Sequence, residues 1–146
     1  MRALLDTSVL IEAERRNFDL DQWVERHEAE VVICDATVTE FLAGEPIKDE
    51  GKRKRFREFW ENVVSQLPSF PLDRAVCERA GALLLLARAK RRTVPLGDAL
   101  HGAVAEVENL TVLTVDAEHF KAMGVQALNP LTGLPRRSSG VGARPV

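Results

Sequence analysis

The sequence predicts an α/β protein, a three-layer α/β/α sandwich in which helices cover both faces of a central parallel sheet. Short apolar runs without polar alternation, typical of strands buried on both faces, alternate with longer segments whose apolar residues recur about every 3.6 positions. Helices that alternate with buried strands form the crossover connections of a parallel sheet. This order of elements therefore places helices on both sides of the sheet.

The strands are predicted from runs of leucine and β-branched residues, and they are expected at Arg2–Leu5, Val31–Cys34, near Phe70, Thr111–Val115 and Val125–Leu128. The helices are predicted from their apolar spacing, and they are expected at 52–67, 73–91 and 97–107, with shorter helices after Asp6 and Ala36. The first long helix carries one apolar stripe, made of Phe56, Phe59, Trp60, Val63, Val64 and Leu67. Asp73 is expected to cap the second helix.

Length and composition indicate one globular domain. The chain has 146 residues, of which 45% are apolar and 29% charged, and this domain is expected to span residues 1–130. Residues 131–146 are rich in Pro, Gly, Ser and Arg and are expected to form a mostly disordered tail. The net charge of −2 gives no overall attraction to nucleic acid.

Features of secreted or membrane proteins are not predicted. Asp6 interrupts the first apolar run, so it does not resemble a signal peptide, and the longest apolar run, Gly81–Ala87, is far shorter than a membrane span. Cys34 and Cys77 are far apart and lack zinc-ligand spacing. Both are interpreted as buried small hydrophobic residues in a reducing compartment, and the protein is expected to be cytoplasmic.

Four acidic residues stand where strands end or helices begin. Asp6 follows the first strand, Glu40 lies early in the helix after the second, Asp98 opens a helix, and Asp116 follows the strand that begins at Thr111. Ligands of open parallel sheets bind at the carboxyl ends of the strands, so these acids can converge there.

A cluster of such carboxylates repels itself unless a cation or protons neutralise it. Mg²⁺ or Mn²⁺ fits oxygen ligands, and two such ions could activate water and stabilise the leaving oxygen of a phosphodiester.

Each acid also has a local explanation. Asp6, Asp98 and Asp116 could cap the helices that follow them, and Thr37-x-x-Glu40 has the pattern of a capping box. A single shared site explains all four positions together, whereas the local explanations must each hold separately.

Four segments together resemble the PIN-domain family, most closely the VapC-like toxins of toxin–antitoxin pairs. The resemblance covers about residues 2–128, and its landmarks are Leu4-Leu5-Asp6-Thr7-Ser8, Thr37-Val38-Thr39-Glu40-Phe41, Asp98-Ala99-Leu100-His101-Gly102-Ala103 and Leu113-Thr114-Val115-Asp116-Ala117-Glu118-His119-Phe120. Each is a weak pattern alone, but their order and separation are fairly specific.

The resemblance implies a PIN-like sandwich and an endoribonuclease that depends on Mg²⁺ or Mn²⁺. It implies that Asp6, Glu40, Asp98 and Asp116 form the acidic, metal-binding and catalytic cluster. It also implies a homodimer and a cognate antitoxin that inserts a peptide segment into the active-site groove.

The resemblance further suggests residues around the metal ligands. Thr7 or Ser8 would lie near enough to hold a water or a phosphate, and His119 would contact the site or only cap and pack. Helical spacing, rather than the resemblance, suggests that His101 could reach the site, because it lies one turn after Asp98; a packed, hydrogen-bonded helix histidine is favoured.

Other features have two interpretations. The basic run 52–57 could grip RNA phosphates or form a solvated helix face, and 90–92 could contact RNA or offset the helix dipole. Trp60 is interpreted as core or interface, and Asp35 as a helix cap.

Rival functions are a phosphoacceptor domain, disfavoured because Asp6 has no acidic neighbour, and a non-catalytic PIN-like module that binds RNA or protein.

Overall fold

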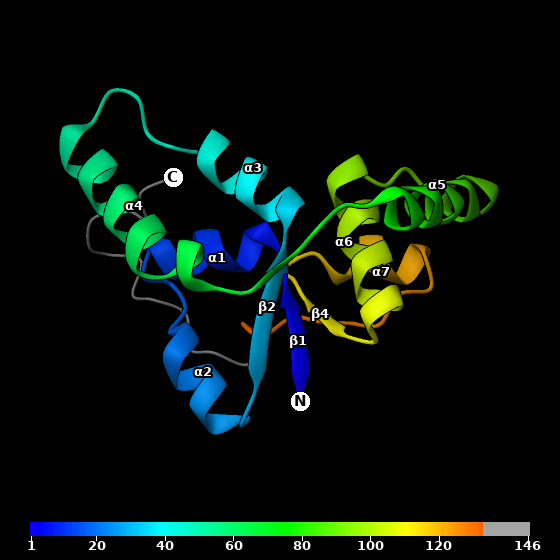
Figure 1. Cartoon of the computed structure of the whole chain (residues 1–146), viewed down its shortest axis with the longest axis horizontal. Coiled ribbons are helices and arrows are strands. Elements are labelled where there is room, and N and C mark those ends of the chain that lie inside the picture. Colours follow the sequence, from blue (N-terminus) through cyan, green and yellow to red (C-terminus); the bar gives the residue numbers. More distant parts are fainter. Residues whose placement is uncertain (133–146) are drawn as a thin grey trace.

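A five-stranded sheet forms the centre of the molecule (Figure 1). The computed structural model describes residues 1–132, so the predicted tail falls outside the described residues from position 133 onward. The strands are β1 (Arg2–Leu5), β2 (Glu30–Cys34), β3 (Ser69–Phe70), β4 (Thr111–Leu113) and β5 (Ala127–Leu128). They are all parallel and follow the order β3-β2-β1-β4-β5, which confirms the predicted fold class.

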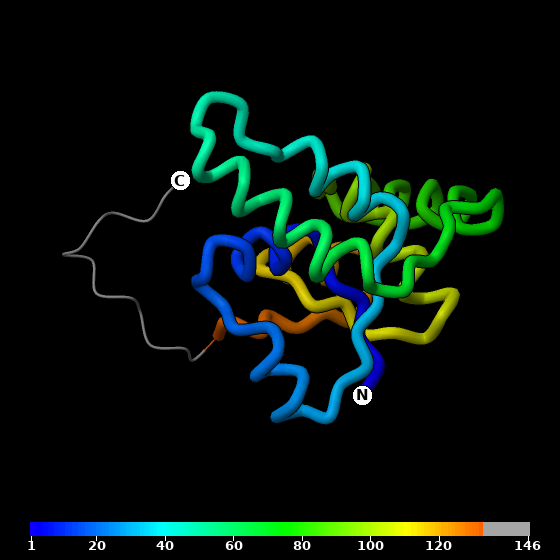
Figure 2. Tube along the Cα trace, turned by 60° about the vertical axis from the view of Figure 1, so that its left-hand side comes forward, coloured from blue at the N-terminus to red at the C-terminus, as the bar shows by residue number. Residues whose placement is uncertain are grey.

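Helices cover both faces of this sheet. In chain order they are α1 (Thr7–Glu14), α2 (Leu20–Arg26), α3 (Asp35–Ala43), α4 (Glu50–Asn62), the 3₁₀ turn η1 (Val64–Gln66), α5 (Arg74–Ala89), α6 (Leu96–Glu108) and α7 (Ala117–Ala122). Figure 1 shows α1, α2 and α4 on one side of the sheet and α5, α6 and α7 on the other, and Figure 2 shows the same separation from a second direction.

Alternate residues of the three central strands, β2, β1 and β4, enter two different cores. Leu4, Val32 and Val112 pack with residues of α5, α6 and α7. Leu5 and its neighbour Ile33 face the opposite way, into the cluster formed with α1, α2 and α4. Because both faces are apolar, the strands show no polar alternation, and this is why they could be predicted as buried parallel strands.

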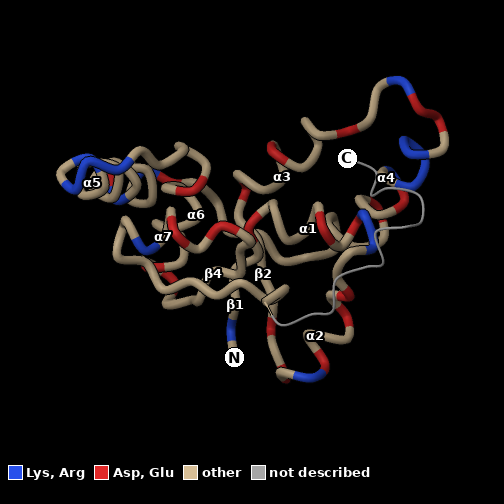
Figure 3. Tube along the Cα trace, turned by 180° about the vertical axis from the view of Figure 1, so that it is seen from behind, with Lys and Arg blue, Asp and Glu red and all other residues tan. Residues whose placement is uncertain are grey.

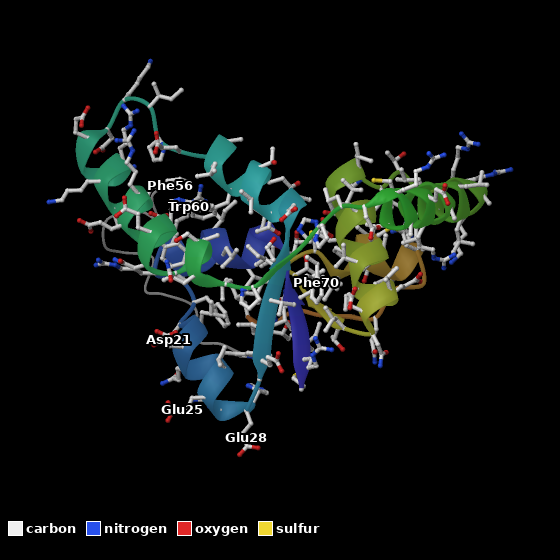
Figure 4. The ribbon with its side chains drawn as sticks, in the orientation of Figure 1. Asp21, Glu25, Glu28, Phe56, Trp60 and Phe70 are labelled. Atoms are coloured by element: carbon white, nitrogen blue, oxygen red, sulfur yellow. The ribbon has the colours of Figure 1, made fainter. Side chains whose placement is uncertain are left out.

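The predicted apolar stripe packs against the core, with Phe56 and Val64 buried and the other four residues partly buried, but the helix is shorter. It ends at Asn62 and continues as η1, because Val63 leaves helical geometry (φ −121°, ψ −69°). Leu67 precedes Pro68, which disfavours helical backbone at that position. Trp60 stacks near Phe41 at a centroid distance of 6.3 Å, in agreement with the core interpretation, and Figure 4 shows its side chain on the α3 side of α4.

Several smaller predictions were wrong. α2 was not predicted at all, and β4 ends at Leu113 rather than Val115. Leu131, placed in the tail, is partly buried and packs against the core cluster that contains Leu5 and Ile33. Cys34 is buried as expected, but Cys77 is exposed. Cys77 lies about 100° around α5 from Val76, which faces the core, and this turns the thiol outward.

The structure also tests the predicted helix cap at Asp73 and the expectation that no segment spans a membrane. The carboxylate of Asp73 accepts a 2.9 Å hydrogen bond from the N–H of Val76, so Asp73 caps α5 as predicted. Among residues 1–132, none of the helices combines the length and apolarity needed to span a bilayer.

The strand order places a topological switch point between β1 and β4. The chain passes from β1 to β2 and β3 on one side, then returns to β4 and β5 on the other. In sheets of this type the connections diverge at the carboxyl ends of the two central strands and leave a ligand-binding crevice there. Asp6 follows β1 directly, and Thr114 follows β4 directly.

Candidate active site

Asp6 is held in a fixed orientation at the end of β1. Its side chain is buried, and Oδ2 accepts hydrogen bonds from the hydroxyls of Ser8 at 2.9 Å and Thr114 at 2.8 Å. Asp6 occupies the N-cap position of α1 but makes no side-chain capping bond. Oδ2 is therefore engaged by two donors, whereas Oδ1 faces the side chain of His101.

Glu40 projects from α3 toward the first turn of α6. Its Oε1 accepts a 2.7 Å hydrogen bond from the hydroxyl of Thr7, and a Cβ added to Gly97 would overlap Oε2. Cys34, not Thr37, is the N-cap of α3, so the capping-box alternative is wrong. The Glu40 side chain is 42% exposed, which opens this side of the site to solvent.

His101 completes a three-residue cluster with these acids. It is fully buried, Nδ1 lies 2.6 Å from the Gly97 carbonyl oxygen, and Nε2 lies 2.7 Å from the Thr37 hydroxyl. Nε2 is also 3.7 Å from Oδ1 of Asp6 and 3.8 Å from Oε1 of Glu40. The favoured interpretation as a packed, hydrogen-bonded histidine was correct, and the same side chain reaches the site.

The charge of His101 follows from these neighbours. Burial by itself lowers the pKa of the imidazole, but the contacts with Cys34, Asp6 and the Gly97 carbonyl outweigh burial and raise the pKa to about 10. A positively charged imidazole then balances part of the carboxylate charge. A cation bound at this position would take the place of that proton.

Asp98 and Asp116 form a second, adjoining network around His119. His119 Nδ1 lies 2.6 Å from Oδ2 of Asp98 and 3.0 Å from Oδ2 of Asp116. Burial raises the pKa of Asp98 above its usual range, the His119 hydrogen bond opposes this rise, and the nearby charge of Asp6 adds to it. The field of Asp6 therefore reaches Asp98, and the two networks lie side by side.

The structure also shows whether Asp98, Asp116 and Asp35 cap the helices that they begin. Pro95 is the N-cap of α6, so Asp98 lies inside the first turn and does not cap it. Asp116 is the N-cap residue of α7 but makes no side-chain capping bond. Asp35 is the first residue of α3, and its carboxylate accepts a 2.7 Å hydrogen bond from Ser69, so the expected cap was wrong.

The inner cluster has the dimensions of a cation site. One ligand atom each from Asp6, Glu40 and His101 can be chosen so that all three lie within 4.8 Å of one another. Within residues 1–132 this is the group with such geometry, and Asp98 and Asp116 are not part of it. Two anionic oxygens and an imidazole nitrogen form a donor set that suits a divalent ion.

Sequence reasoning missed Thr114 and Thr37. Thr114 is fully buried and bonds to Asp6, and Thr37 is fully buried and bonds to His101. Both residues lie within landmark segments of the family resemblance, but a threonine near a strand end is too common a pattern to select these two as parts of the site.

The basic run of α4 is largely engaged within the protein. Arg53 and Arg57 both bond to Glu45, and Arg55 bonds to Glu14 at 3.1 Å. Figure 3 shows basic residues concentrated on α4 and α5, with acidic residues on the helices around the upper end of the sheet. Three arginines of the run thus have ion-pair partners within the protein.

A carboxylate and imidazole cluster at the switch point defines a candidate metal site on a doubly wound α/β fold. The sequence model of the PIN domain family matches residues 3–125, and the chain belongs to this family.

Two curated proteins are similar over nearly their whole length. The plasmid stability protein StbB of Pseudomonas syringae pv. tomato is 32% identical over 136 residues, covering 87% of this chain and 96% of that protein. Ribonuclease VapC1 of Rickettsia felis is 28% identical over 133 residues, covering 90% and 96%.

Two solved structures share the fold. FitAcB from Neisseria gonorrhoeae has a TM-score of 0.74 at 24% identity, covering 89% of this chain and 99% of that one. The DNA-bound VapBC from Salmonella typhimurium has a TM-score of 0.75 at 18% identity, covering 89% and 98%.

Proposed function

We propose that this protein is a metal-dependent endoribonuclease and the toxin of a toxin–antitoxin pair. Membership of the PIN family supports this function, as does the similarity to proteins named ribonuclease VapC. The observation that carries the proposal is the meeting of Asp6 and Glu40, 34 positions apart in the chain, around one buried imidazole at the switch point.

The proposed roles follow from position and charge. Asp6, Glu40 and Asp98 hold the principal divalent ion, Mg²⁺ or Mn²⁺, and Asp116 completes the cluster directly or through water. Support comes from the raised pKa of Asp98. Burial disfavours its ionised form, and a bound cation would stabilise that form. Thr7, Ser8 and His119 act around these ligands.

When bound, the ion would supply a Lewis acid for a phosphodiester oxygen and lower the pKa of a water. The residues of the chain itself orient the carboxylates that would hold the ion. Ser8 and Thr114 direct Oδ1 of Asp6 inward, Thr7 orients Glu40, and the exposed side of Glu40 leaves room for RNA. Ser8 donates its hydroxyl to Asp6 rather than to a histidine, so it is not paired with a base for nucleophilic attack.

The proposed partners are RNA, a cognate antitoxin that places a peptide in the active-site groove, and a second copy of the chain as a homodimer. Solved structures of similar fold are toxin–antitoxin complexes, some of them bound to DNA, which supports the antitoxin. We propose that the protein acts on RNA in the cytoplasm.

Cleavage of defined RNA oligonucleotides with Mg²⁺ or Mn²⁺, and with EDTA, tests the proposal. Asp6→Asn and Asp98→Asn should each lower cleavage by about 100-fold or more while circular dichroism stays unchanged. Asp21→Asn is the matched control, because Figure 4 shows Asp21 on α2, far from the upper end of the sheet. Full activity in either site variant would remove the catalytic assignment.

A non-catalytic module that binds RNA or protein is the alternative. It predicts metal-independent RNA binding and no cleavage by the wild-type protein with either ion. Toxicity supplies a cellular test: expression should arrest growth, and co-expression of the cognate antitoxin, sought in the reading frames next to this gene, should relieve the arrest. Growth arrest that persists in Asp6→Asn would favour the alternative.

A further inference from the structure

We propose that the imidazole of His101 is a direct ligand of the divalent ion, so that the site combines nitrogen and oxygen donors and prefers Mn²⁺ to Mg²⁺. This inference deepens the proposed function and depends on a metal ion binding at the Asp6–Glu40 cluster. It concerns a residue that is not among the four acidic residues predicted as metal ligands.

The hydrogen bonds of His101 set the ring for coordination. Nδ1 lies 2.6 Å from the carbonyl oxygen of Gly97, and a carbonyl can only accept, so Nδ1 carries a hydrogen. In the neutral ring the lone pair is then on Nε2. Histidines that bind metals typically donate their other ring N–H to a backbone carbonyl or a carboxylate, which fixes the tautomer and the ring plane.

The distances around Nε2 agree with a shared ion. Ligand bonds to Mn²⁺-sized or Zn²⁺-sized ions are about 2.0–2.2 Å, so two ligands of one ion lie about 3 Å apart when adjacent and about 4.2 Å apart when opposite. Nε2 lies 3.7 Å from Oδ1 of Asp6 and 3.8 Å from Oε1 of Glu40, inside that interval. An ion between these three atoms needs only small side-chain shifts.

Burial separates this imidazole from ordinary surface histidines. His101 is fully buried, yet its Nε2 points toward the half-exposed carboxylate of Glu40. Nε2 also lies 2.7 Å from the hydroxyl of Thr37, and an ion bound to Nε2 would displace this hydrogen bond. The competing structural role, a ring that only joins α3 to α6, uses this same bond and requires no ion.

The donor set determines the expected metal. Mg²⁺ prefers oxygen ligands and usually keeps several waters, whereas imidazole favours transition-metal ions. A site of carboxylates alone would not discriminate in this way. Replacement of the nitrogen donor should therefore weaken Mn²⁺ binding much more than Mg²⁺ binding.

Pulsed electron paramagnetic resonance of Mn²⁺ bound to the wild-type protein is the first test. Directly coordinated histidine nitrogen should produce a nuclear modulation that changes when histidine is labelled with ¹⁵N. His119 is the other histidine near the site, so the experiment is repeated with His119→Gln, in which the modulation should persist. The measurement needs no variant of His101, and absence of nitrogen coupling in the wild-type protein would overturn the proposal.

Calorimetric titration of metal-free wild-type protein and His101→Gln is the second test. We expect the variant to lose about 10- to 100-fold in Mn²⁺ affinity and less than about 3-fold in Mg²⁺ affinity. Equal losses for both ions would mean that His101 only supports the fold and would overturn the inference.

The two proposals fail separately. Wild-type protein that cleaves RNA but shows no coordinated nitrogen contradicts the role of His101 alone. Wild-type protein that shows coordinated nitrogen but cleaves no RNA with either ion contradicts the proposed nuclease function and leaves the ligand assignment standing.

Discussion

The hydroxyl of Thr114 donates a 2.8 Å hydrogen bond to Oδ2 of Asp6, across 108 positions of the chain. The same hydroxyl oxygen accepts a 3.0 Å hydrogen bond from the N–H of Asp116. One fully buried side chain therefore orients the first acid of the site and fixes the start of the segment that carries the last.

Replacement of this hydroxyl should damage both stability and metal binding. Thr114→Val keeps the shape of the side chain but leaves Oδ2 of Asp6 with one donor and the Asp116 N–H without its acceptor. We expect unfolding free energy to fall by about 1–2 kcal/mol and divalent-ion affinity to fall by about 10-fold. Urea unfolding and calorimetric titration measure the two effects.

Thr111→Val is the matched control for this prediction, because Thr111 lies at the opposite end of the same strand. It should change neither quantity measurably, since valine is well suited to a strand. Equal metal affinity in Thr114→Val and the wild-type protein would show that Asp6 is oriented without Thr114.

The sequence was sufficient for the architecture because the relevant signals are local. The run Ala3-Leu4-Leu5 is apolar on both faces, and such a run predicts a strand covered on both sides. The position of Asp6 directly after this strand then places the acid at the carboxyl edge of the sheet. Each of these inferences needs only a few consecutive residues.

The geometry of the site could not be predicted in the same way, because it depends on contacts between distant segments. The hydrogen bond between His101 and Thr37 joins α6 to α3 across 64 positions of the chain. Nothing in the sequence around either residue predicts this contact. Likewise, the exposure of Cys77 depends on which face of α5 meets the sheet. The separation of the acids into two adjoining networks follows from tertiary packing alone.

The basic run of α4 contains one arginine whose loss should destabilise the fold. Arg55 bonds to Glu14, whose side chain is 8% exposed, so Arg55→Gln leaves a nearly buried carboxylate without its partner. We expect a loss of about 1–3 kcal/mol in unfolding free energy. Thermal and urea unfolding, together with RNA affinity at several salt concentrations, distinguish a structural role from RNA binding.

Arg53→Gln in the same run provides the comparison. Glu45 keeps its 2.8 Å bond to Arg57 in that variant, and exposed ion pairs contribute little. Its unfolding free energy should change by less than about 0.5 kcal/mol. If Arg55→Gln leaves stability unchanged but lowers RNA affinity, the basic run serves substrate binding instead.

Asp98 should destabilise the metal-free protein at neutral pH. Burial raises its pKa in the folded state, so the folded protein binds this proton more tightly than the unfolded chain does. The stabilising contribution is then fully present below the ordinary aspartate pKa of about 3.9 and is lost as pH rises through the raised folded-state pKa. Asp98→Asn avoids this loss of stability, because the asparagine side chain cannot ionise.

Urea unfolding in EDTA tests the sign. The stability of Asp98→Asn relative to the wild-type protein should increase as the pH rises from about 4 toward neutrality. Addition of Mn²⁺ should stabilise the wild-type protein more than the variant, since binding to the folded state alone raises its stability. A stability difference that stays constant over this range would contradict the raised pKa.

Gly97 should be required for the position of Glu40 rather than for the helix. A Cβ at residue 97 would overlap Oε2 of Glu40, and the flexible end of that side chain would move before the backbone does. Gly97→Ala should therefore lower RNA cleavage and divalent-ion affinity by about 10-fold or more while stability changes little. Cleavage rates, metal titration and thermal unfolding measure these effects.

Gly81→Ala is the matched control, because a Cβ at residue 81, on the exposed side of α5, would meet nothing within 4 Å. The same substitution there should raise unfolding free energy by about 0.5–1 kcal/mol, since alanine is the better helix former, and should leave cleavage unchanged. Both variants replace a helical glycine with alanine, and only Gly97→Ala disturbs a carboxylate. If both variants cleave RNA at the wild-type rate, the position of Glu40 beside α6 does not matter for catalysis, and its assignment as a metal ligand is wrong.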